Sequence, residues 1–172
     1  MTFTSISEAR WVWLALLRSG VPCEPAQWTA WSEARLFATE RAPEWLCDFG
    51  SAATRDEALH AVSAGIGQET PPEIDEQGLV IGFVVGRHLS GELTFEAMWE
   101  KLTALTDIAE FLDAEKWKQY STLPSSQVVG PPNAEHGILV TLGPLADFAN
   151  EVGSSLLAGP NPSFKRTPDG AA

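Results

Sequence analysis

Apolar residues recur at helical spacing through the first 65 positions of the chain. We expect a first helix that begins with the capping box Ser5–Glu8 and ends at Gly20. Pro25 suits the first turn of a second helix, in which tryptophan and alanine residues follow at intervals of three and four. Similar patterns predict a short third helix over 43–50 and a fourth over 54–65, each ended by glycine.

The segment from Leu79 to Leu89 allows two interpretations. Val, Ile and Phe predominate in it, which is typical of a buried strand. However, Gly78, Gly82 and Gly86 follow one another at intervals of four residues, which would place all three on one face of a helix. Each glycine inside a helix costs about 1 kcal/mol relative to alanine, so close packing of another helix would have to offset that cost. We favour the helix and keep the strand as the alternative.

The stretch from Thr94 to Asp113 has the clearest amphipathic pattern. One face of the predicted helix is apolar and holds Met98, Leu102, Leu105, Ala109 and Leu112. The opposite face is an acidic stripe with two aromatic residues at its flanks, and aromatic residues beside charge are common interface anchors. The candidate binding residues on and beside this stripe are Glu96, Trp99, Glu100, Asp107, Glu110 and Phe111.

The C-terminal third is less regular. Ser, Pro, Gly and Asn are frequent between positions 121 and 137, which predicts a long loop. Ile138–Leu142 is the best strand candidate, and Gln127–Val129 could pair with it in a minor β-hairpin. A terminal helix is expected over Pro144–Ala158.

These elements predict a mainly α-helical fold. A single compact domain of six or seven helices would span residues 1–158, with at most a minor β-hairpin near its C-terminal third. Residues 159–172 are polar and contain several proline residues, so we expect a disordered tail there.

Composition and charge narrow the class of protein. Hydrophobic residues make up 44% of the 172 residues, which excludes a disordered acidic protein. The net charge of −12 argues against a nucleic-acid partner, because phosphate binding requires Lys and Arg. No apolar run reaches the roughly 18 residues of a membrane span, and the N-terminus lacks the features of a signal peptide. We expect a cytoplasmic protein without a membrane partner, in which Cys23 and Cys47 are reduced, with a disulfide as the alternative.

No motif indicates catalysis. His60, His88 and His136 have no metal-binding spacing, and the chain lacks both a nucleophile elbow and a phosphate-binding glycine motif. We therefore expect no enzyme activity, no metal and no cofactor. Five of the seven tryptophan residues lie within the first 45 positions. They predict a packed aromatic core, and a ligand pocket lined by indole rings is the alternative.

Two interpretations of the acidic stripe remain: a solvated face that keeps the protein soluble, or a surface complementary to a basic partner. The acidic helix Thr94–Asp113 and the helix around Trp28 and Trp31 give the chain the general character of small acidic helical proteins. In this character it resembles the immunity proteins of bacterial toxin systems. The resemblance implies a protein-binding module that neutralises a basic toxin such as a nuclease. A helical adaptor or regulatory protein of unknown partner, and an enzyme without a recognisable motif, are the alternatives.

Overall fold

The computed structural model describes residues 5–39, 41–68, 75–106 and 132–157. Within these ranges it contains seven α-helices and one 3-10 turn but no strand, which confirms the mainly α-helical class and the number of helices. The helices are α1 (Ile6–Ser19), α2 (Pro25–Ala38), α3 (Glu44–Ser51), α4 (Arg55–Ser63), α5 (Glu76–Leu89), α6 (Phe95–Leu105) and α8 (Pro132–Leu157), and the turn is η1 (Ile66–Gln68). The predicted tail, residues 159–172, lies outside the described residues.

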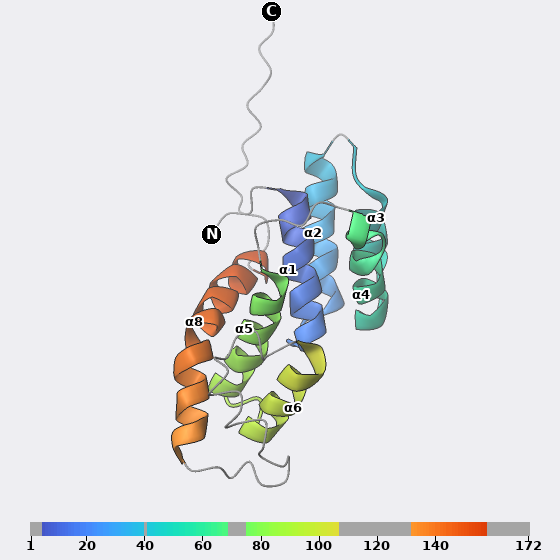
Figure 1. Ribbon diagram of the computed structural model, residues 1–172. Coiled ribbons are helices and arrows are strands. Elements are labelled where there is room, and N and C mark those ends of the chain that lie inside the picture. The colour runs from blue at the N-terminus through green and yellow to red at the C-terminus, as the bar shows by residue number, and fades with distance from the viewer. Residues whose placement is uncertain (1–4, 40, 69–74, 107–131, 158–172) are drawn as a thin grey trace, which may run out of the picture.

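Helix α1 lies between two groups of helices (Figure 1). On one side, α2 packs against α3 and α3 against α4, which also contacts α1. On the other side, α1 packs against α5, and α5 in turn packs against α6 and α8. Within the described ranges, no helix has the length and hydropathy needed to cross a bilayer.

The predicted capping boxes at the starts of α1 and α4 are both formed. The Ser5 hydroxyl oxygen accepts from the Glu8 N–H at 3.1 Å, and the Glu8 carboxylate accepts from the Ser5 N–H at 3.3 Å. Thr54 and Glu57 exchange the equivalent pair of bonds, each at 3.2 Å. These bonds satisfy N–H groups that have no partner inside the helix, and so they fix where each helix begins.

Helix α5 is central to the fold. Its residues from Gly78 to Gly86 are all buried, and they contribute to two hydrophobic cores, one shared with α1 and one with α6 and α8. The favoured helical interpretation of this segment is therefore confirmed. At Gly82 a Cβ atom would collide with the Leu145 carbonyl oxygen and lie 2.7 Å from Ala149 Cβ. Glycine at this position lets the backbones of α5 and α8 approach closely.

The N-terminal tryptophans form a packed core around Phe49. The ring centroid of Phe49 lies between 5.1 and 6.3 Å from those of four buried tryptophans, Trp13, Trp28, Trp31 and Trp45. Edge-on and tilted geometries predominate, as expected for rings with opposite charge at face and edge. The aromatic-core interpretation is confirmed for these four residues.

The predicted strand over Ile138–Leu142 is wrong, because this segment belongs to α8. Ile138, Leu142 and Ala146 recur every four residues, and all three are buried in the core shared with α5 and α6. A strand would place Val140 on the same side as Ile138 and Leu142, but Val140 is 64% exposed. The helical period of burial therefore outweighs the β-branched composition. The proposed partner strand, Gln127–Val129, lies outside the described residues.

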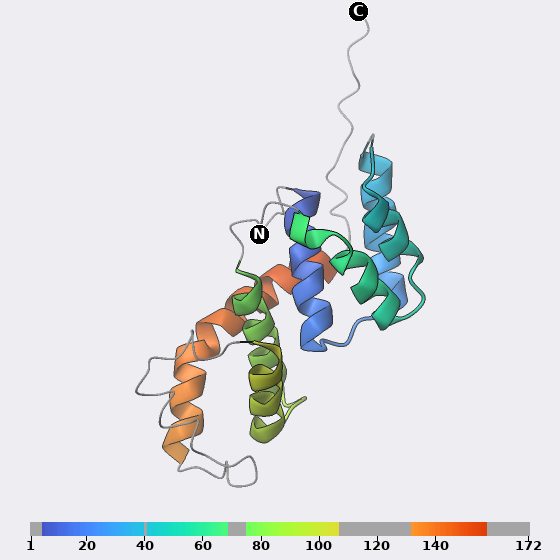
Figure 2. The same cartoon turned by 45° about the vertical axis from the view of Figure 1, so that its right-hand side comes forward.

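The predicted start of the last helix is also wrong. Helix α8 begins at Pro132, and Pro144 lies inside it. Proline has no N–H to donate to the carbonyl of Val140, and its ring crowds the preceding turn. Helix α8 bends along its length, as Figure 2 shows, and an internal proline is the usual cause of such a bend.

Candidate functional site

Acidic and basic side chains differ strongly in exposure. Among the side chains that the structure describes, twelve of the fourteen Asp and Glu residues are exposed, compared with two of the seven Lys and Arg residues. The exposed acids occur on α2, α3, α4, α6 and α8, so they are not confined to the one predicted stripe. The described surface is therefore predominantly negative. Several arginine side chains do not offset these acids at the surface, because they bind main-chain carbonyl groups instead.

Arg10 is 1% exposed, and its guanidinium binds carbonyl groups at the end of the neighbouring helix α4. Its Nε donates to the Val62 carbonyl at 2.9 Å, and its Nη2 donates to the Ala64 carbonyl. Its guanidinium also lies over the Trp45 ring, 4.7 Å from the centroid. Arg10 thus caps the C-terminus of α4, where carbonyl groups lack partners within the helix and the helix dipole favours a cation.

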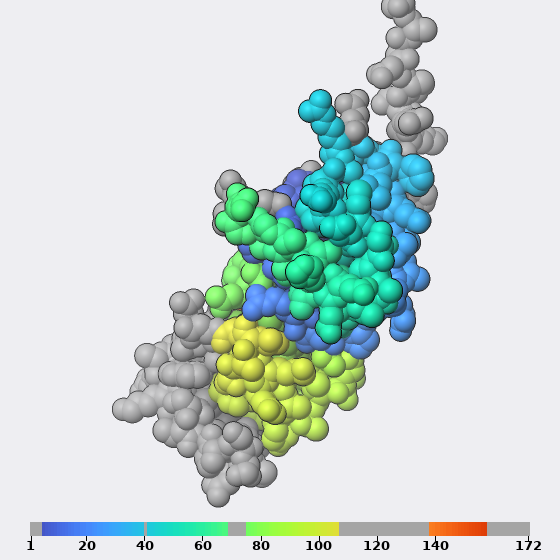
Figure 3. All heavy atoms as spheres, turned by 90° about the vertical axis from the view of Figure 1, so that its right-hand side faces the viewer, coloured from blue at the N-terminus to red at the C-terminus, as the bar shows by residue number. Residues whose placement is uncertain are grey.

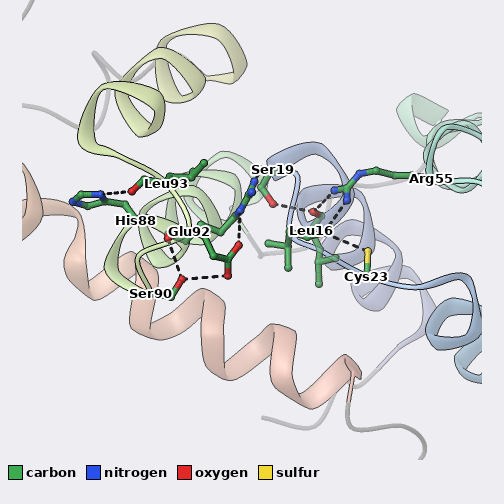
Figure 4. A network of polar contacts seen from close by, with 10 residues as sticks. Leu16, Ser19, Cys23, Arg55, His88, Ser90, Glu92 and Leu93 are labelled. Carbon is green, nitrogen blue, oxygen red and sulfur yellow. Dashed lines mark hydrogen bonds and ion pairs between the residues drawn. The ribbon is translucent and has the colours of Figure 1, made fainter.

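Arg55 likewise binds carbonyl groups at the end of α1 (Figure 4). Its Nη2 donates to the Leu16 carbonyl at 3.1 Å and to the Leu17 carbonyl, and its Nη1 donates to the Val21 carbonyl at 2.8 Å. Because Arg55 is half-buried at the first turn of α4, its positive charge is directed inward rather than toward solvent.

Two further arginines also bind main-chain carbonyls. Arg87 donates to the Ser19 carbonyl at 3.2 Å, at the end of α1, and pairs with Glu92 at 3.1 Å. Arg18 pairs with Glu76 at 2.5 Å and makes a long contact of 3.5 Å to the carbonyl of Leu105. Four of the seven described cations therefore hold helix ends together.

The predicted helix Thr94–Asp113 is too long at its C-terminal end, because α6 ends at Leu105 and its C-cap Thr106 has an extended backbone. The structure describes half of the predicted acidic stripe. Glu96 and Glu100 are exposed on α6, opposite the buried residues Met98 and Leu102, as the pattern predicted. Trp99 is only partly buried and packs against the core shared with α5 and α8, so it supports the helix as well as flanking the acids. The other three candidates, Asp107, Glu110 and Phe111, lie outside the described residues.

A second acidic surface, which sequence reasoning did not single out, lies on α3 and α4. We call it the α3–α4 face and define it by four exposed carboxylates, Glu44, Asp48, Asp56 and Glu57. A shallow hollow of about 560 Å³ runs between the two helices and is lined by three of these acids and by His60. Figure 3 shows α3, α4 and α6 on one face of the molecule. The signal in the sequence was the pair of short helices, each with acids at its polar positions.

A second hollow adjoins the α3–α4 face. It has a volume of about 480 Å³ and is lined by Glu44, Trp45 and Asp48 together with the buried Arg10. Asp48 and Ala64 line both hollows, so the two hollows are neighbours. Of the N-terminal tryptophans, Trp45 contributes to this hollow while its ring also packs in the aromatic core.

Neither cysteine forms a disulfide, as predicted. Cys23 is half-buried, whereas Cys47 is exposed on α3. Burial raises the pKa of the Cys23 thiol above its ordinary value; the nearby Arg55 opposes this shift and Glu24 adds to it. In the described part of the chain, no three His, Cys, Asp or Glu side chains come together as metal ligands would.

Comparison with known proteins adds no assignment. The chain matches no protein-family model, no curated protein and no solved structure at a significant level.

Proposed function

We propose that this protein is a protein-binding module whose partner is a basic protein. The observation that carries the proposal is the opposite placement of its charges. Carboxylates point outward from five of the helices, while four arginines are used at helix ends. A surface of this kind attracts a cationic partner over a distance and speeds encounter.

The α3–α4 face and the exposed acids of α6 form the proposed contact surface. Lys and Arg side chains of a partner would lay their aliphatic stems in the two hollows and bring their charges to Asp48, Asp56 and Glu44. The two reciprocal arginine caps join α1 to α4, so this surface is presented on a fixed framework. A rigid surface loses little conformational entropy when it binds.

Within this proposal, the resemblance to immunity proteins suggests the kind of partner. The protein would act in the cytoplasm by covering the basic cleft of a toxin, such as a nuclease, whose substrate is polyanionic. An acidic surface would occupy the positive groups that otherwise hold the nucleic acid. A toxin-like reading frame next to the gene for this chain would support this form of the proposal.

The test is affinity capture from the native cells, with two charge-reversed variants of equal net charge. Asp48→Lys/Asp56→Lys alters the α3–α4 face, whereas Glu33→Lys/Asp147→Lys alters exposed acids of α2 and α8 that line neither hollow. We expect the wild type and the second variant to retain a basic protein that salt releases, and the first variant to lose it. Capture of no basic protein, or equal capture by both variants, would contradict the proposal.

A further inference from the structure

A separate hollow lies where α1, α5 and α8 meet. Its volume is about 190 Å³, and its apolar wall is formed by Leu16, Val21, Phe83 and Leu157. None of the residues that line this hollow also lines either of the two hollows at the α3–α4 face, so this hollow is a separate site. An apolar recess with a few polar groups at its rim is the usual form of a small-molecule site.

Two glycines shape the hollow. Gly153 of α8 leaves room for the Phe83 ring, because a Cβ atom there would lie 2.7 Å from Phe83 Cε1. Gly86 of α5 lies opposite Asn150, whose Oδ1 atom would be 3.1 Å from a Cβ at position 86. Both glycines line the hollow, so its walls include bare backbone where most helices would carry side chains.

The formal charges at the rim are already paired. Arg87 Nε donates to Glu92 Oε2 at 3.1 Å, and Ser90 Oγ lies 3.2 Å from Glu92 Oε1 (Figure 4). The single Ser90 hydroxyl proton is shared between Glu92 Oε1 and the Arg87 carbonyl oxygen, which lies 3.0 Å from Ser90 Oγ. Among the described residues, Arg87 and Glu92 are the only charged ones that line the hollow, so its rim carries no net charge. A charged ligand would lose its hydration there without a net electrostatic gain, whereas an uncharged ligand loses less on entering.

Hydrogen-bonding capacity nevertheless remains at the rim. Of the five N–H groups of Arg87, one binds Glu92 and one binds Ser19, with no third partner among the described residues. Asn150 and Ser154 also line the hollow, and neither forms a side-chain hydrogen bond to another described residue. The rim thus offers surplus donors from Arg87 and both a donor and an acceptor from the Asn150 amide.

We propose that this hollow binds an uncharged molecule with a single ring and a carboxamide group. The carbonyl oxygen of the ligand accepts from Arg87, its amide N–H donates to Asn150, and its ring lies against Phe83 and Leu157. The size fits, because a dry protein cavity of about 150 Å³ is known to hold benzene. This site goes beyond the proposed protein-binding function and can be tested without the partner.

The first test is an NMR titration of the full chain with three probes of similar size: benzamide, benzoate and benzylammonium. We expect benzamide to shift the backbone amide signals of Gly86, Asn150 and Gly153 in a saturable way, with benzoate and benzylammonium at least about fivefold weaker. Saturable binding of either charged probe as tight as that of benzamide would overturn the proposal. So would the absence of saturable shifts with benzamide at these three residues.

Variants on α8 then locate the site. Ser154→Trp fills the mouth of the hollow and should abolish benzamide binding, and Asn150→Ala should weaken it about fivefold. Asp147→Ala is the matched control, because Asp147 is exposed on the same helix but does not line the hollow. Its affinity should stay within about twofold of the wild type. Unchanged binding by the folded Ser154→Trp variant would show that benzamide binds elsewhere.

Discussion

Arg10 and Arg55 cap each other's helices. Arg10 of α1 donates to the Val62 carbonyl at the end of α4, and Arg55 of α4 donates to the Leu16 carbonyl at the end of α1. This exchange gives carbonyl groups at the two helix ends a further donor, and it places two cations at two negative dipole ends. The same exchange removes positive charge from the outer surface.

Arg10→Met should therefore destabilise the protein strongly. Met keeps much of the apolar volume but leaves the Val62 and Ala64 carbonyls without the Arg10 donor and removes the contact to Trp45. We expect a loss of about 3 kcal/mol in the free energy of unfolding, measured by urea denaturation. Arg41→Met is the control, since Arg41 is exposed, and should change stability by less than about 0.5 kcal/mol. Equal effects of the two substitutions would contradict the capping role.

Gly82→Ala tests the close approach of α5 and α8. Alanine favours a helix over glycine by about 1 kcal/mol, but here its methyl group would collide with the Leu145 carbonyl and Ala149. We expect the collision to prevail, with a net loss of about 2 kcal/mol and a lower thermal midpoint. At Gly67 nothing lies within 4 Å of an added Cβ, so Gly67→Ala should be close to neutral. A more stable Gly82→Ala variant would show that the helices are not packed this closely.

Phe49→Ala tests the aromatic core. The Phe49 ring is fully buried and contacts four tryptophans, so its removal leaves a cavity. We expect a loss of about 4 kcal/mol together with a weaker near-ultraviolet circular dichroism signal, because the tryptophan rings lose their fixed environment. Phe49→Leu fills most of the space and should cost less than half as much. Similar losses for both variants would argue against a close-packed site.

The two thiols should react at very different rates. Cys47 is exposed, whereas Cys23 is half-buried and its raised pKa leaves little thiolate at neutral pH. With an alkylating reagent at pH 8 we expect one fast and one slow modification, and mass spectrometry of peptides should assign the fast one to Cys47. Faster modification of Cys23 would contradict the described burial.

The raised pKa of Cys23 also gives stability a direction with pH. Below the ordinary thiol pKa of 9.0, which we take for the unfolded state, both states are protonated and the contribution of Cys23 to stability is fully present. Above it the unfolded state loses the proton first, so stability falls as pH rises through the raised folded value. Urea denaturation at pH 7 and pH 9.5 should show a larger decrease for the wild type than for Cys23→Ala.

Local signals in the sequence determined much of this fold, while long-range contacts explain the errors. The capping boxes and the glycine spacing of α5 are local, and they predicted the helices correctly. The β-branched residues of Ile138–Leu142 predict a strand, but α5 and α6 cover one helical face of this segment, and no local signal shows that burial. Pro144 suits a helix start, and nothing nearby in the sequence shows that the helix extends through it.

The candidate site was harder to predict than the fold for a similar reason. The acids of α6 could be placed on one face from their spacing alone, and Glu96 and Glu100 are exposed there. The α3–α4 face depends on two short helices packing side by side, which periodicity does not reveal. Arg10 and Arg55 bind carbonyl groups that lie 52 and 39 positions away in the chain. The composition shows only that both residues are positively charged, and it does not show that their charges are directed inward.

The central claim is that outward carboxylates of the α3–α4 face bind a basic partner. Its most direct test compares the dissociation constants of the captured partner for Asp48→Lys/Asp56→Lys and Glu33→Lys/Asp147→Lys, at one ionic strength and with matched thermal midpoints. We predict binding that is at least about 30-fold weaker for the first variant than for the second, because charge reversal at a contact turns attraction into repulsion. A ratio near one would show that only the overall charge matters and would contradict the account.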